Sequence, residues 1–103
     1  MSERSFPHPR LEEVELADLL SALSDPTRLG IVAALADGAE HSSGELAGGI
    51  PKSTMSHHLR ILREAGLTRT VPDGMRCRIT LRRAEIERRF PGMLDAILKH
   101  AGR

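Results

Sequence analysis

A chain of 103 residues with a net charge of +1, two aromatic residues and one cysteine can form one small domain with an aliphatic core. The scarcity of aromatic side chains argues against binding of single-stranded nucleic acid by base stacking, and the lone cysteine excludes an internal disulfide. No apolar run approaches about 18 residues and the N-terminus has no apolar signal core, so we expect a cytoplasmic protein that does not enter a membrane.

The first part of the chain predicts an arm followed by two helices. We expect residues 1–10 to form a flexible N-terminal arm and residues 11–103 to form one domain. From Leu11 apolar residues recur at steps of three and four, which predicts a helix that ends just before Asp25. Asp25 suits the N-cap of a second, mostly apolar helix, and Gly38 suits the end of that helix.

A short third helix and a longer fourth helix follow. Ser42 and Glu45 are three residues apart and predict a capping box at the start of the third helix. Gly48 and Gly49 end that helix, and a recognition helix is expected over residues 52–65. Two helices joined by a tight glycine turn are typical of a helix-turn-helix.

Beyond the fourth helix the period of the apolar residues becomes two. Residues 67–71 and 75–81 predict two strands around a turn at residues 72–74. In the second strand, Met75 and Cys77 are expected on the apolar face and the arginines on the opposite face. A short charged helix over residues 83–89 and a last amphipathic helix that begins at Pro91 then end the chain, so the fold class is mainly α with a small β-hairpin.

Charge is distributed unevenly along the chain. Residues 1–51 contain three arginines and nine acidic residues, whereas residues 52–103 contain twelve basic and five acidic residues. This asymmetry indicates a polyanion-binding surface on the basic half, although a solvated face that is merely basic is the simpler alternative.

The fourth helix carries its apolar residues Met55, Leu59 and Leu62 on one side and short hydrogen-bond donors on the other. Short donors can reach phosphates and base edges once a helix lies in the major groove, and a helix N-terminus offers N–H groups to a phosphate. We therefore predict that the first turns of this helix bind DNA. The basic hairpin should contact the DNA backbone beside them.

Two strings of residues, ALSDPTRL at 22–29 and STMSHHLRILREAGL at 53–67, followed by a basic hairpin, resemble the ArsR-type (ArsR/SmtB) winged helix-turn-helix transcriptional regulators. The resemblance covers roughly residues 14–81. It implies a winged helix-turn-helix that dimerises through its N- and C-terminal helices and represses a promoter until a signal releases it. A twofold dimer would place its recognition helices about one DNA turn apart on a palindromic operator. The alternative is that the terminal helices fold back onto the monomer's own core.

The resemblance also implies where DNA is contacted. The recognition helix would lie in the major groove and the wing, residues 67–81, on the backbone. The candidate DNA-binding residues are Lys52, Ser53, Thr54, Ser56, His57 and Arg60 on the helix, with Arg69, Arg76 and Arg78 on the wing. His58 either contacts DNA or packs at the edge of the core, Arg28 is expected to be structural or at best a phosphate contact, and Pro51 replaces the polar cap usual in the family.

No metal or other cofactor is predicted. Many members of the resembled family bind metal through cysteines near the third helix or through Asp and His on the last helix. Here the third-helix region EHSSGELAGG has no cysteine, and Asp95 and His100 do not share a helix face. Cys77 is expected to be a buried small hydrophobe rather than a redox sensor. An effector, if one exists, is not identified by the sequence.

Two other classes of function fit the residues less well. The chain lacks a nucleophile–base pair, a glycine-rich phosphate loop and paired carboxylates, so we do not expect an enzyme. The alternative function is a winged-helix protein–protein interaction module without operator binding, in which the basic hairpin docks an acidic partner. Such a module should expose apolar anchors on the fourth helix, and the polar residues found there favour DNA.

Overall fold

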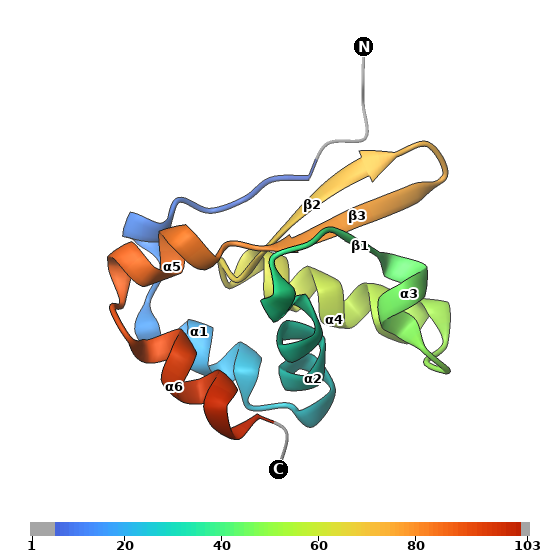
Figure 1. Ribbon diagram of the computed structural model, residues 1–103. Coiled ribbons are helices and arrows are strands. Elements are labelled where there is room, and N and C mark those ends of the chain that lie inside the picture. Colours follow the sequence, from blue (N-terminus) through green and yellow to red (C-terminus); the bar gives the residue numbers. More distant parts are fainter. Residues whose placement is uncertain (1–5, 102–103) are drawn as a thin grey trace.

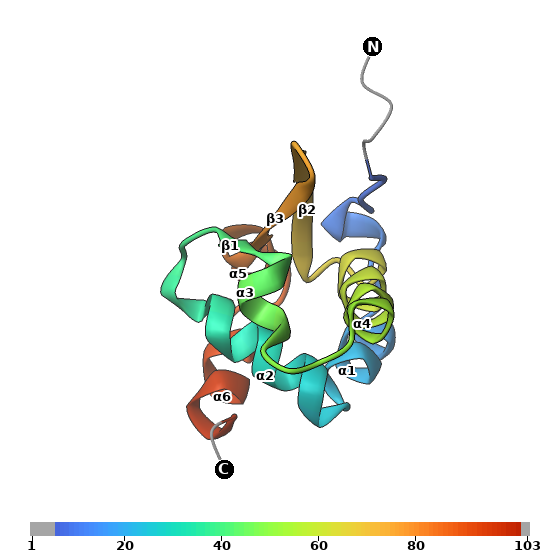
Figure 2. The same cartoon turned by 90° about the vertical axis from the view of Figure 1, so that its right-hand side faces the viewer.

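The computed structural model describes residues 6–101, which form helices around one small sheet (Figure 1). In chain order the elements are η1 (Leu11–Glu13), α1 (Leu16–Leu23), α2 (Pro26–Ala34), η2 (Leu35–Asp37), β1 (His41–Ser42), α3 (Ser43–Ala47), α4 (Lys52–Glu64), β2 (Thr68–Asp73), β3 (Arg76–Leu81), α5 (Arg83–Arg89) and α6 (Met93–His100). This order confirms the predicted fold class, mainly α with a small β-hairpin. Figure 2 shows the hairpin of β2 and β3 rising above α3 and α4.

The sheet has three antiparallel strands in the order β1-β3-β2. The hairpin pairs Thr68 with Leu81 at its base and Asp73 with Arg76 at its tip, and His41 of β1 pairs with Ile79 on the other side of β3. Strand β1 was not predicted from the sequence, because two residues are too few to show an alternating pattern. Since β2 lies at an edge, it tolerates Pro72, which cannot donate to a neighbouring strand.

The turn of the hairpin lies later than predicted. Because Asp73 still pairs with Arg76, only Gly74 and Met75 form the loop. The prediction that Met75 lies on the apolar face of the sheet is therefore wrong. Its side chain stands at the tip of the wing and is 96% exposed.

One aliphatic core lies between the helices and the inner face of the sheet. Apolar residues from both halves of the chain are completely or almost completely buried in it, among them Leu19, Val32, Leu35, Leu62, Leu67, Ile79, Ile86 and Leu94. Met55, Leu59 and Leu62 are buried as predicted for the apolar face of α4. The burial of that face directs the opposite face of α4 to solvent.

The first helix does not start at Leu11 as predicted. Leu11 begins a single 3-10 turn, Val14 is extended with ψ 128°, and the α-helix begins only at Leu16. Arg89 of α5 donates from Nε to the carbonyl of Leu11 and from Nη2 to the carbonyl of Val14, both at 3.2 Å. Arg89, which lies 75 or more residues further along the chain, thus donates to carbonyls that would accept backbone hydrogen bonds in a continuous helix.

Gly66 ends α4 where the chain passes closest to Val14. Its φ is +86°, and a Cβ there would lie 2.7 Å from Val14 Cγ2. We expect Gly66→Ala to lower the free energy of unfolding by about 2 kcal/mol or more, because left-handed strain and overpacking add together. Gly38 has a φ of +82°, but a Cβ added there would meet nothing within 4 Å, so Gly38→Ala should cost only about 1 kcal/mol. Urea unfolding followed by circular dichroism measures both, and equal losses would contradict the close contact with Val14.

The described part of the N-terminal arm, residues 6–10, contains no helix or strand and runs beside β2 (Figure 1). The backbone N–H of Thr70 donates to His8 Nε2 at 2.9 Å, and Arg82 Nη1 donates to the carbonyl of Pro9 at 2.8 Å. Burial, and after it the charges of Arg69 and Arg82, lower the pKa of His8, which favours the neutral imidazole that can accept this bond. The flexibility expected of residues 1–10 stays a prediction, and residues 1–5 lie outside the described residues.

Within residues 6–101 no single helix is long and apolar enough to cross a membrane. The segments Leu16–Leu23 and Pro26–Asp37 pass that test together by length and composition, but a bend of 96° separates them.

Candidate nucleic-acid interface

Helix α3 is fixed at its start by the predicted capping box. Ser42 Oγ accepts a hydrogen bond from the backbone N–H of Glu45 at 3.1 Å, and Glu45 Oε1 accepts one from the backbone N–H of Ser42 at 2.8 Å. This second bond is the main reason that the pKa of Glu45 is lowered. Gly48 ends the helix, and the N–H of Ile50 then donates to the carbonyl of Ala47 in the turn toward α4.

Helix α4 begins without a side-chain cap, because its N-cap residue is Pro51. The first bond of the helix runs from the N–H of Met55 to the carbonyl of Pro51 at 2.9 Å. The N–H groups of residues 52–54 therefore precede the helical ladder and point out of its N-terminus. Together with the helix dipole they form a suitable site for a phosphate group.

The face of α4 that turns away from the core carries polar side chains at every predicted contact position. Lys52, Ser53, Thr54, Ser56, His57 and Arg60 are all exposed. Arg60 Nη2 lies 3.2 Å from His57 Nδ1, which holds these two side chains together one turn apart. The surface thus combines short neutral donors with cations, as contacts to base edges and phosphates require.

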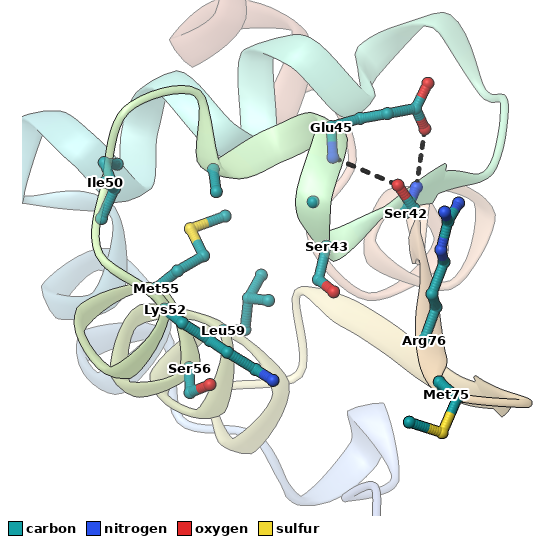
Figure 3. A pocket seen from close by; sticks show the side chains of 12 residues that line it. Ser42, Ser43, Glu45, Ile50, Lys52, Met55, Ser56, Leu59, Met75 and Arg76 are labelled. Carbon is teal, nitrogen blue, oxygen red and sulfur yellow. Dashed lines mark hydrogen bonds between the residues drawn. The ribbon is translucent and has the colours of Figure 1, made fainter.

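A cleft of about 640 Å³ separates this face of α4 from α3 and the wing (Figure 3). Lys52 and Ser56 line it from α4, Ser43 lines it from α3, and Met75 and Arg76 line it from the tip of the wing. In Figure 3 Lys52 extends from α4 toward the wing tip. Sequence reasoning missed Ser43 and Met75, because the first lies in a capping motif and the second was assigned to an apolar strand face.

A second hollow of about 500 Å³ lies along α4 on the side of the N-terminal arm. Ser53, His57 and Arg60 line it together with Phe6 and Cys77. Lys52 and Ser56 line both hollows, so this edge of α4 lies between the two hollows. The prediction that Cys77 is buried holds only in part, because its side chain is half-buried.

The three wing arginines do not lie together. Arg76 is exposed and lines the cleft beside α4, and no ion pair of its side chain is found within residues 6–101. Arg78 Nε donates to Asp73 Oδ2 at 2.8 Å, and this bond raises the pKa of Arg78. Arg69 Nη2 donates to Glu85 Oε1 of α5 at 3.1 Å. Of the three, only Arg76 lines the cleft beside the recognition helix.

His58 and Arg28 form a contact inside the domain. His58 is half-buried, and its Nδ1 lies 3.3 Å from Arg28 Nη1. Arg28 Nε in turn donates to the carbonyl of Ala22 at 2.7 Å, and Asp25 caps α2 through the backbone N–H of Arg28, as predicted. These contacts favour packing over DNA binding for His58 and agree with the structural role expected of Arg28.

The described residues give no sign of a metal centre. No group of three or more His, Cys, Asp or Glu side chains within residues 6–101 is arranged to hold an ion. His41 Nε2 instead lies 3.0 Å from Asp37 Oδ2, and its Nδ1 lies 3.9 Å from Glu45 Oε1. The hydrogen bond from the backbone N–H of Ala39, and after it the one from His41, lower the pKa of Asp37.

Comparison with known proteins gives consistent matches. Residues 23–71 match the model of a helix-turn-helix domain family. The chain is 39% identical over 84 residues to the uncharacterised HTH-type transcriptional regulator YceK of Bacillus subtilis, which covers 79% of this chain and 84% of that protein. The structure of the transcriptional repressor BigR from Xylella fastidiosa is similar with a TM-score of 0.65 and 32% identity, over 82% of this chain and 83% of that one. An ArsR-like transcriptional regulator from Rhodococcus has a TM-score of 0.62 and 30% identity, over 79% of this chain and 77% of that one.

Proposed function

Because this chain belongs to the ArsR-type family of winged helix-turn-helix transcriptional regulators, and is a DNA-binding repressor of that kind, we propose how it engages its operator. The first turns of α4 enter the major groove, and the wing contacts the backbone beside it. The observation that carries this proposal is the exposed polar edge formed by Lys52, Ser53, Ser56 and His57, with Arg76 among the residues that line the cleft beside it.

Each of these groups has a distinct task in the proposed complex. The N–H groups at the start of α4 and the Lys52 ammonium bind a phosphate and set the depth of the helix in the groove. Ser56 and His57 lie one turn further on, where short donors reach base edges. Arg60 and Arg76 bind phosphates on either side of them. Recognition by binding alone requires no catalytic group, so we propose that the protein is not an enzyme.

We further propose that the repressor is a homodimer that binds a palindromic operator. Leu16 and Leu20 lie one turn apart on α1 and remain 43% and 42% exposed, which is unusual for leucines of a small domain. Met93 and Ile97 on α6 are half-buried. In Figure 1 both helices lie at the end of the molecule away from the wing tip, so a partner bound there would leave the wing free.

The alternative of a protein–protein interaction module has less support. That function needs aliphatic or aromatic anchors on the exposed face of α4. The exposed positions in its first turns are instead Lys, Ser, Thr and His.

The proposed DNA contacts predict different effects for two neighbouring wing arginines. Arg76→Ala should weaken binding about equally on every DNA sequence and flatten the slope of log affinity against log salt by about one unit, because one phosphate contact is lost. Arg78→Ala is the matched control and should change the slope less, since Asp73 and Glu40 already engage its guanidinium. Fluorescence anisotropy measures both variants on a duplex from upstream of the protein's own gene and on a scrambled duplex.

The same titrations test the placement of α4. Ser56→Ala and His57→Ala should change the preference between the two duplexes more than the salt slope. Full affinity and full slope in the Arg76 variant would show that the wing does not lie on the backbone. Failure of the unmodified chain to bind any duplex at low salt would refute the proposed mode of action altogether.

A further inference from the structure

A basic cavity, separate from the two hollows along α4, lies away from the recognition helix. It has a volume of about 540 Å³ and is bordered by the N-terminal arm, the start of β2 and helix α5. Figure 1 places α5 at the opposite end of the hairpin from the wing tip. Five arginines line the cavity, Arg10, Arg69, Arg82, Arg88 and Arg89, against the two carboxylates of Glu12 and Glu85.

The two carboxylates offset only part of the positive charge of the five arginines that line this cavity. Both carboxylate oxygens of Glu85 are hydrogen-bonded to arginines of the cavity wall. Oε1 accepts from Arg69 Nη2 at 3.1 Å and from Arg82 Nε at 2.8 Å, and Oε2 accepts from Arg82 Nη2 at 3.0 Å. Arg10 lies 3.7 Å from Glu12 and 3.9 Å from Glu13, and all three side chains are largely exposed, so these ion pairs are weak. An excess of guanidinium charge therefore faces the cavity.

Several of these guanidinium groups are held in place by the fold itself. Arg82 is almost completely buried and also donates from Nη1 to the carbonyl of Pro9. Arg89 is fixed by the carbonyls of Leu11 and Val14 and lies over the ring of Phe90. A guanidinium has five N–H donors, and the contacts within residues 6–101 use three of those of Arg82 and two of those of Arg89. These contacts hold both guanidinium groups in the wall of the cavity and leave two N–H donors of Arg82 and three of Arg89 unused by them.

Arg88 completes the wall without a structural task of its own. Its side chain is exposed on α5, lines the cavity, and has no hydrogen bond or ion pair within residues 6–101. Arg83, on the same helix, is also exposed but forms an ion pair with Asp95 of α6 and does not line the cavity. The two residues differ in whether they line the cavity and in whether a carboxylate already pairs with them.

We propose that this cavity is a binding site for a small multivalent oxyanion, a molecule carrying phosphate groups or several carboxylates. The planar fork of arginine matches both groups in two-point hydrogen bonds, and a cluster of arginines from three segments disfavours cations and neutral molecules. The volume exceeds that of one phosphate ion and accommodates an organic anion. Because the anion would hold the arm, β2 and α5 together, its binding should change the position of the wing and hence the affinity for DNA. This last consequence rests on the proposed function, whereas the site itself does not.

Isothermal titration calorimetry of the full chain with pyrophosphate and with citrate tests the site directly, at constant ionic strength of about 150 mM set with sodium chloride. We expect saturable binding of at least one probe with a dissociation constant of about 1 mM or tighter, and the stronger of the two identifies phosphate or carboxylate as the preferred group. Arg88→Ala should weaken binding about tenfold, because a charge-assisted contact is lost. Arg83→Ala, which removes the same charge from the same helix, should bind like the unmodified chain.

Several results would overturn the proposal. Binding of neither probe, or equal affinity of the Arg88 variant and the unmodified chain, would refute the site, and thermal unfolding verifies that both variants are folded. A loss of DNA affinity with a flatter salt slope in the Arg88 variant, measured without pyrophosphate or citrate, would show that the arginines contact the DNA backbone instead. A probe that binds but leaves the affinity for the upstream duplex unchanged would refute only the coupling to the wing. Failure of the unmodified chain to bind DNA would refute the proposed function and leave the calorimetric result standing.

Discussion

Replacing Leu16 and Leu20 together by serine is expected to convert the protein into a monomer and to lower operator affinity by about a hundredfold or more. The two side chains are 43% and 42% exposed, and in the proposed dimer they bury this area against the partner. Each leucine would contribute about 1 kcal/mol, and four leucines in the dimer would change its dissociation constant roughly a thousandfold. A monomer then loses the gain in affinity that comes from binding two half-sites at once.

Analytical ultracentrifugation measures the change in association state, and anisotropy on the upstream duplex measures the loss of affinity. Val71→Ser is the control, because Val71 is 48% exposed but lies on the wing. It should leave the association state unchanged. A double variant that remains a dimer, or a monomer that binds the operator with full affinity, would contradict the proposed interface or the need for it.

Replacing Glu85 by glutamine should lower the free energy of unfolding by about 3 kcal/mol at neutral pH. Glu85 holds the guanidinium of Arg82, whose side chain is only 4% exposed, and the change would leave that cation buried without its carboxylate. Loss of one partner of a buried pair costs about 3–5 kcal/mol, and we expect the lower end because a third of Glu85 reaches solvent. Glu87→Gln on the same helix is the matched control, because the new amide oxygen can still accept from the N–H of Gly92.

The effect of the Glu85 change should depend on pH in a defined direction. The hydrogen bond from Arg82 is the main cause that lowers the pKa of Glu85 from 4.5 to about 2 in the folded protein. Between these values the unfolded chain binds a proton that the folded chain does not, so this part of the stability is present above pH 4.5 and is lost as the pH falls toward 2. The difference in unfolding free energy between the unmodified chain and the glutamine variant should therefore shrink from pH 7 to about pH 3. An equal difference at both pH values in urea titrations would exclude the carboxylate charge as its source.

The local features of the recognition region were predictable from short stretches of sequence. The N-cap at Asp25 and the capping box of Ser42 and Glu45 depend on groups three residues apart, and both are present. The apolar spacing of Met55 and Leu59 fixed which side of α4 is buried and hence which residues are exposed. The nine predicted contact residues remain predictions as DNA contacts, but the six on α4 lie on one exposed surface.

The turn of the wing and the partners of its arginines could not be predicted from the local sequence. Strand alternation correctly indicated a hairpin, yet it placed Met75 on the apolar face, because the turn position depends on pairing between Asp73 and Arg76. The sequence also could not separate the three wing arginines. Arg69 pairs with Glu85, which is sixteen residues further along the chain, and of the three only Arg76 lines the cleft beside α4.

The order of the helices, the hairpin, the polar edge of α4 and the family could all be predicted from the amino-acid sequence, because these features depend on spacing and capping between near neighbours. Two features could be seen only in the folded domain: the break of the first helix at Val14, whose carbonyl accepts from Arg89, and the cavity that five arginines line. Those features join the arm, β2 and α5, which lie far apart in the chain. The free energy of such a contact depends on burial and on competing partners, and neither quantity exists until the chain has folded.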